Sequence, residues 1–223
     1  MKTHVTMVLF DRVTILDFIG PYEIFTRVKD WEVEVVSFHS PEIICEGGLK
    51  ILVDRKIQDI QSTDLLFLPG GTGVNDVIQN KNFLQELKRL GENSQYVTSV
   101  CTGSLVLAVA GLLNGYKATT HWRSLPFLKN FPIEVVEDRV VFDRNRITAG
   151  GITSGIDFGL ELISKIEGEQ IAQEMELWIE YNPRPAFKVG HPSLADDSLV
   201  QTVKSKTEKG YAIRESIITK ILG

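Results

Sequence analysis

The sequence lacks several features that would place it in a specialised class of protein. It has two cysteines among 223 residues, Cys45 and Cys101, and neither belongs to a CxxC pair. No apolar run approaches the roughly 20 residues needed to span a bilayer, and the first residues show no signal-peptide pattern. We therefore expect a cytoplasmic protein with no membrane partner, for which neither a disulfide nor structural zinc is needed.

An excess of positive charge is also missing. The chain carries 24 Lys and Arg against 29 Asp and Glu, a formal net charge of −5. Because phosphate binding requires a basic face, this balance argues against nucleic acid as a partner. The four histidines are scattered, so we expect no metal and no cofactor. The length suits one large domain with a sizeable core, which we expect to span residues 1–223.

Short apolar runs alternate along the chain with segments of helical periodicity. Continuous apolar strands that alternate with helices predict an α/β protein, a three-layer α/β/α sandwich around a mostly parallel central sheet. Strands are expected at 4–10, 31–38, 65–68, 96–100, 133–136, 140–142 and 147–149, with a small hairpin at 43–53. Helices are expected at 16–28, 82–92, 105–113, 154–166, 169–180 and 210–222. Ligands of such sheets bind beyond the C-terminal strand ends.

One of those ends carries Cys101, between the strand expected at 96–100 and the next helix. A cysteine at such a corner is the thiol form of a nucleophile elbow, with its sulfur exposed above the sheet. The helix N-terminus favours negative charge and is expected to lower the pKa of the thiol. Cys101 could instead be a small residue that fills a tight corner, but we favour the nucleophile. Cys45 is interpreted as a small buried hydrophobe.

A glycine-rich turn, Pro69-Gly70-Gly71-Thr72-Gly73, follows the strand expected at 65–68. Glycines let the backbone approach a ligand and direct amide groups toward developing negative charge. We expect Gly70, Gly71 and the Thr102 amide to form an oxyanion or substrate-binding pocket. An ordinary turn and a phosphate site are the alternatives, although the P-loop pattern is absent.

Two further residues are candidates for proton transfer. Asp17 lies in an apolar run, where a carboxylate must find partners or shift its pKa upward, as a general acid or base requires. Its alternative role is that of a helix N-cap ahead of Pro21. His121 could act as a base toward Cys101, or it could simply pack beside Trp122.

These segments, in this order, resemble the ThiJ/PfpI superfamily, whose flavodoxin-like fold is similar to that of class I glutamine amidotransferases. The matching residues are 8–11, 16–25, 68–71, 100–104, 119–122, 148–151, 181–187 and 190–192. Within the superfamily the chain is most similar to the isonitrile hydratase branch, which an aspartate at position 17 favours. The resemblance implies a catalytic Cys101, an acidic partner at Asp17, a role for Thr102 and a homodimer.

Three functions remain open at this point. The first is a cysteine-dependent hydratase that acts on a small electrophilic molecule, an isonitrile, with Asp17 as acid and base. The second is a redox-sensing or protective protein that uses oxidation of Cys101. The third is an intracellular cysteine protease or amidase that pairs Cys101 with His121.

Overall fold

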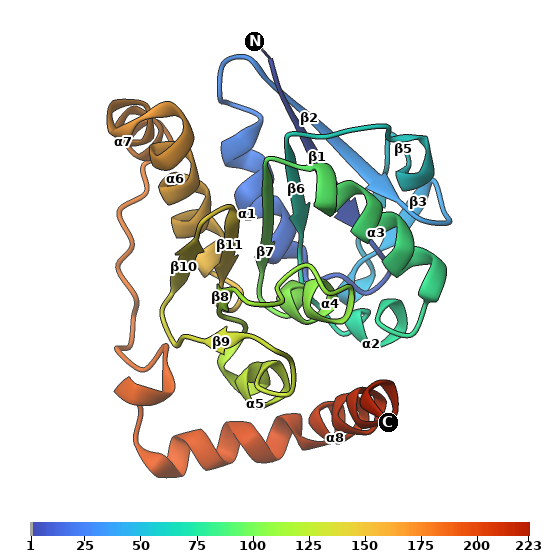
Figure 1. The fold of residues 1–223 in the computed structure, drawn as a ribbon. Helices are drawn as coiled ribbons and strands as arrows, with labels where there is room; N and C mark the ends of the chain where they lie inside the picture. The colour runs from blue at the N-terminus through green and yellow to red at the C-terminus, as the bar shows by residue number, and fades with distance from the viewer. Residues whose placement is uncertain (1) are drawn as a thin grey trace.

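A seven-stranded sheet forms the centre of the computed structural model, which describes residues 2–223. Its strand order is β10-β11-β7-β6-β1-β2-β5, and all neighbours are parallel except the pair β10 and β11 (Figure 1). The strands are β1 (Thr3–Leu9), β2 (Trp31–Ser37), β5 (Arg55–Lys56), β6 (Leu65–Leu68), β7 (Tyr96–Val100), β10 (Val140–Asp143) and β11 (Arg146–Ala149). The prediction of a mostly parallel sheet is confirmed.

Helices cover both faces of this sheet, as Figure 1 shows. Helix α1 (Ile15–Phe25) packs against α6 (Ser154–Glu167), which in turn contacts α7 (Glu169–Trp178). On the other face, α4 (Gly103–Val109) contacts α2 (Val74–Val77), α3 (Lys81–Asn93) and α5 (Leu125–Leu128). Sheet residues are therefore enclosed from both sides, and every residue of β6 is fully buried. The three-layer α/β/α prediction is confirmed.

Two small sheets lie outside the central one. The hairpin of β3 (Glu42–Ile44) and β4 (Lys50–Leu52) confirms the predicted turn around two glycines. The strand predicted at 133–136 is shorter than expected: β9 (Glu134–Val135) pairs with β8 (Lys117–Ala118) apart from the central sheet.

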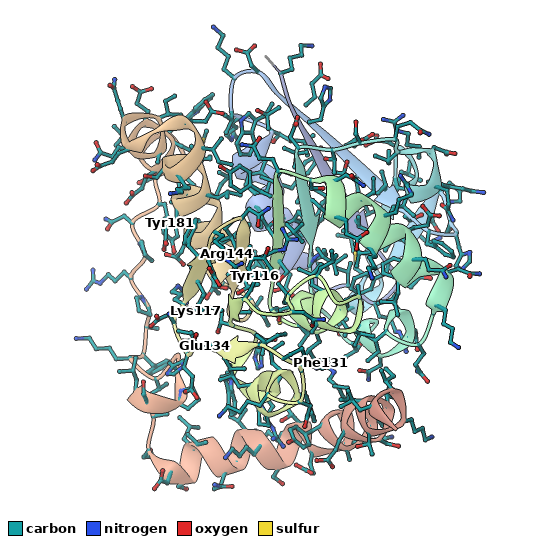
Figure 2. All side chains as sticks on the ribbon, viewed as in Figure 1. Tyr116, Lys117, Phe131, Glu134, Arg144 and Tyr181 are labelled. Carbon is teal, nitrogen blue, oxygen red and sulfur yellow. The ribbon has the colours of Figure 1, made fainter. Side chains whose placement is uncertain are left out.

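Side-chain contacts fix this second small sheet in place, as Figure 2 shows. Lys117 pairs with Glu134 across the two strands at 3.4 Å. The guanidinium of Arg144 lies 3.7 Å from the centre of the Tyr116 ring and donates to the Gly115 carbonyl. The β10–β11 turn is thereby anchored to the segment that leads into β8.

The C-terminal helix differs most from its predicted extent. Helix α8 (Asp197–Leu222) begins at Asp197 and not near residue 210, and the Asp196 side chain caps it by accepting from the Leu199 amide. Most of its residues are exposed, so its first turns carry no strong apolar periodicity that sequence analysis could detect. No helix of residues 2–223 is long and apolar enough to cross a membrane.

Four 3₁₀ turns complete the elements: η1 (Glu46–Gly48), η2 (Ile57–Asp59), η3 (Trp122–Ser124) and η4 (Pro192–Leu194). Because β11, β7, β6 and β1 are adjacent, the loops after their C-terminal ends lie side by side. These four loops begin near Asp11, Pro69, Cys101 and Gly150. The sheet order therefore gathers residues from distant parts of the chain at one edge.

Candidate active site

Cys101 has the backbone geometry of a nucleophile elbow. Its φ of +55° lies in the left-handed region, which non-glycine residues rarely adopt. The Cys101 amide donates to the carbonyls of Ala149 at 3.0 Å and Gly150 at 2.9 Å, which ties the elbow to the end of β11. A Cβ at Gly103 would lie 2.3 Å from the Leu68 carbonyl oxygen, so only glycine allows α4 to start so close to β6.

The expected exposure and acidity of this thiol are wrong. Cys101 is only 5% exposed. Burial raises the pKa of the Cys101 thiol well above its usual range, and the neighbouring Asp17 raises it further. The Thr102 amide and Arg214 act in the opposite direction, because both favour the thiolate, but burial outweighs them. The resting sulfur therefore holds its proton, and an activating base is required.

Asp17 is positioned to be that base. It lies in the first turn of α1, completely buried, while Thr14 occupies the N-cap position, so the capping alternative does not apply. Its Oδ2 accepts from the Gly70 amide at 3.2 Å, its Oδ1 is buried with no hydrogen-bond partner, and the carboxyl group lies beside the Cys101 thiol. Burial raises the pKa of Asp17 to about 7, although its interactions with Cys101 and the Gly70 amide lower it in part. The carboxyl group therefore exchanges protons near neutral pH.

Thr102 and the two glycines form one hydrogen-bonded unit. The Gly71 amide donates to Thr102 Oγ1 at 3.0 Å, while the Gly70 amide is engaged by Asp17. The expected pocket with free Gly70 and Gly71 donors is therefore not present, since both amides already have partners within the protein. The Thr102 amide faces the Cys101 sulfur. The glycines instead support Asp17 and Thr102: a Cβ at Gly70 would lie 2.6 Å from the Thr102 nitrogen.

His121 lies near this unit, but its side chain makes its contacts with other residues. Its Nδ1 accepts from the Arg123 amide at 3.2 Å, and its ring packs beside Trp122 and against Gly151. Burial, with a contribution from the charge of Arg214, lowers the pKa of His121 to about 4. The ring is thus neutral at pH 7. The packed interpretation fits this geometry better than the catalytic one.

Sequence reasoning missed two charged residues of the site. Arg214 reaches it from α8, and Glu46 reaches it from η1, where its carboxylate accepts from the Thr72 amide and the Thr14 hydroxyl. Glu46 raises the pKa of Asp17 through its charge. Neither residue stands in a recognisable motif, and only the three-dimensional arrangement brings them to the strand ends.

No cation site accompanies these residues. Within residues 2–223, no group of three or more His, Cys, Asp or Glu side chains is arranged to hold a metal ion. The chemistry that the arrangement offers is proton exchange between a buried carboxyl group and a buried thiol, beside a backbone amide.

Comparison with known proteins places this site in a family. The DJ-1/PfpI family model matches residues 3–165. A relative named isonitrile hydratase, from Pseudomonas putida, is 36% identical over 97% of this chain and 95% of its own length. The crystal structure of a ThiJ/PfpI family protein from Pseudomonas syringae has a TM-score of 0.94 at 30% identity, with 98% of this chain and 91% of that chain covered.

A transcriptional regulator is also similar. GbdR of Pseudomonas aeruginosa, named as an HTH-type regulator, is 28% identical over 93% of this chain, which covers 57% of the regulator. Proteins with different functions thus share this core. The match to the family model over residues 3–165, together with the two Pseudomonas relatives, shows that the chain belongs to the DJ-1/PfpI family.

Proposed function

We propose that the chain is a cysteine-dependent hydratase, which adds water to an isonitrile and releases an N-substituted formamide, with no metal or organic cofactor. The observation that carries the proposal is the buried pair of Asp17 and Cys101, in which a carboxyl group with a pKa of about 7 and an unpaired buried oxygen lies beside the thiol. Its similarity to a relative named isonitrile hydratase, which extends over 97% of the chain, supports the substrate class.

The first half of the reaction forms a covalent intermediate. Ionised Asp17 takes the thiol proton as the sulfur bonds to the terminal carbon of the isonitrile. Protonated Asp17 then gives that proton to the same carbon. The product of this half is a thioimidate, R–N=CH–S–Cys101, and Asp17 is again ionised. The Thr102 amide, which faces the sulfur, favours the developing thiolate.

The second half consumes water. Asp17 takes a proton from a water molecule as the water oxygen bonds to the thioimidate carbon, and it gives that proton to the nitrogen. The tetrahedral adduct, R–NH–CH(OH)–S–Cys101, then expels the sulfur while Asp17 carries the hydroxyl proton to it, and R–NH–CHO leaves. One carboxyl group thus serves in both halves, which requires a pKa near the working pH.

A turnover assay tests this proposal directly. The full chain is incubated with cyclohexyl isocyanide, and the N-substituted formamide is quantified by mass spectrometry. Intact-mass measurement during turnover should detect the chain plus one isonitrile on Cys101. The proposal fails if no isonitrile in a panel with different substituents is hydrated while the thiol still reacts with a small alkylating reagent.

The position of His121 separates this mechanism from amide hydrolysis. His121→Asn keeps a side-chain acceptor near the Arg123 amide but removes the imidazole. We expect isonitrile turnover within about threefold of the parent, because Asp17 supplies the proton transfers and loss of a true general base costs roughly 100-fold or more. Isonitrile kinetics of the parent and of His121→Asn measure this. Loss of activity with an unchanged melting temperature would instead assign His121 to the chemistry.

We further propose that the chain acts as a homodimer in the cytoplasm, where its two free cysteines stay reduced. Large apolar side chains are exposed on α7 and on the connection between α7 and η4: Leu177 by 83%, Trp178 by 65% and Phe187 by 78%. Exposed apolar side chains favour association, so we assign these three residues, the apolar patch, to the interface between two copies.

Light scattering tests the dimer. The parent should have twice the mass of one chain. Phe187→Glu, which places a charge in the apolar patch, should weaken association by about 30-fold, the effect of removing an interface hot spot. Lys188→Glu is the matched control at the adjacent exposed position and should remain dimeric. A monomeric parent would contradict the proposal.

A further inference from the structure

Arg214 connects the C-terminal helix to the candidate site. Helix α8 turns one narrow face toward the rest of the molecule, with Tyr211, Arg214 and Ile218 spaced three to four residues apart. Ile218 is buried, and the Tyr211 ring stacks on Phe127 with 4.5 Å between the ring centres. These two contacts hold Arg214 in place between them.

The guanidinium of Arg214 bridges three segments. Its Nε donates to Asn75 Oδ1 at 2.9 Å, and its Nη1 donates to Ser124 Oγ at 3.2 Å. Its Nη2 lies 3.5 Å from the carbonyl oxygen of Gly71. The planar fork of an arginine suits such a bridge, whereas a lysine ammonium has no equivalent geometry. Arg214 therefore joins the glycine turn, α2 and the η3 turn that follows His121.

The position of Gly71 gives this bridge its importance. The Gly71 amide donates to Thr102 Oγ1, and the Thr102 hydroxyl lies 3.4 Å from the Gly71 carbonyl that Arg214 also approaches. Thr102 in turn follows Cys101 directly. A displacement of the Gly71 turn would therefore move Thr102, whose amide faces the sulfur.

The charge of Arg214 also acts at the site. All three of its acceptors are neutral oxygens, and no salt bridge within residues 2–223 includes it. Asp17 on α1 and Arg214 are the charged groups that act on Cys101, while Glu46 in η1 lies near both of these and His121 before η3 lies near Arg214. Arg214 is the one cation among these four, because His121 is neutral.

We infer that Arg214 is a positioning residue for Cys101, which holds the Gly71–Thr102 unit in register and supplies the positive charge that a thiolate at the elbow requires. It touches neither the sulfur nor a substrate in this structure, so it acts through Thr102 and through its electric field. The turnover part of this inference rests on the proposed hydratase function, whereas the thiol reactivity does not.

Thiol alkylation tests the inference without any assumption about the substrate. The rate of Cys101 modification by iodoacetamide, a small neutral reagent, is measured from pH 6 to 10 by peptide mass spectrometry, which separates Cys101 from Cys45. Three variants are compared with the parent: Arg214→Met, Arg214→Lys and the control Lys209→Met. Lys209 is exposed on the same helix, so its substitution removes an equal charge far from the bridge.

Arg214→Met should slow alkylation about tenfold throughout pH 6 to 10, where the thiol is mostly protonated, because a neighbouring opposite charge lowers a pKa by 1–3 units and a rise of one unit lowers the thiolate fraction tenfold. Arg214→Lys should recover the alkylation rate but not the parent kcat for an isonitrile, because the positive charge is kept and the planar fork is lost. Lys209→Met should match the parent. Melting temperatures identify a variant that has unfolded. If Arg214→Met is unfolded, Arg214→Lys provides the test in its place.

The two proposals fail separately. A parent-like alkylation profile in folded Arg214→Met would overturn the inference, even if isonitriles are hydrated. A slower profile in a chain that hydrates no isonitrile would support the role of Arg214 and reject the hydratase function.

Discussion

Replacement of Cys101 by alanine should abolish hydration of isonitriles, with a loss of 1,000-fold or more, on the order seen when a covalent nucleophile is removed. Without the sulfur no thioimidate forms, and Asp17 has no thiol proton to accept. Cys101→Ser keeps the shape of the elbow but substitutes a poorer nucleophile, so it should be nearly as inactive. Initial rates with cyclohexyl isocyanide measure both effects.

Cys45→Ala serves as the matched control. Cys45 is also a buried free cysteine, but it stands on the hairpin side of the molecule, between β3 and η1. Its removal should leave turnover unchanged. Full activity in Cys101→Ala would reject the covalent mechanism. If the parent instead turns over no electrophile, while dilute peroxide oxidises Cys101 selectively, the redox-sensing alternative is supported.

Asp17→Asn should lower kcat by roughly 100- to 10,000-fold, the usual contribution of general acid–base catalysis. The asparagine side chain can still accept from the Gly70 amide, so the local geometry is retained. It cannot take the proton from Cys101 or from water. Isonitrile turnover should therefore fall much further than alkylation of Cys101 at high pH, where hydroxide removes the thiol proton.

The pH profile of the parent gives this prediction a second readout. The pKa of Asp17 is raised to about 7, so the carboxylate that accepts the thiol proton is present mainly above that pH. The ratio kcat/KM should consequently rise as the pH rises through about 7. Asp17→Asn should lose this inflection. A parent profile that is flat between pH 5.5 and 8.5 would remove Asp17 from the proposed role.

Stability measurements show whether Asp17→Asn has simply unfolded. Because the folded-state pKa of Asp17 lies above its unfolded value of 3.8, the group favours folding at low pH, and this contribution is lost as the pH rises through about 7. The three-unit difference corresponds to on the order of 4 kcal/mol. Asp17→Asn should therefore gain stability relative to the parent at pH 8 but not at pH 4, in denaturant titrations.

The sequence predicted the scaffold of this site well. Continuous apolar runs such as 65–68 identified buried parallel strands, because a strand covered on both faces cannot carry alternating polar residues. The sheet order then brought together the four loops that begin near Asp11, Pro69, Cys101 and Gly150. The elbow at Cys101 was recognisable because both of its flanking elements are local features.

The burial and protonation of the Cys101 sulfur could not be predicted from local sequence features. The local rule, a helix N-terminus that acidifies a thiol, was correct in sign for the Thr102 amide, but burial outweighed it. Burial depends on what covers the elbow, which includes residues far along the chain. Arg214 illustrates this: it lies 113 positions after Cys101, in a helix whose sequence shows a mostly solvated surface.

The burial of Cys101 limits the width of the molecules that can reach its sulfur. A sulfur with 5% of its residue surface accessible admits narrow groups end-on, such as the linear head of an isonitrile, more readily than branched ones. The disulfides that exchange with thiols in cells, which are formed by tripeptides, are much bulkier than the linear isonitrile group. The same fold that demands a base to ionise the thiol thereby shields it from routine thiol–disulfide exchange.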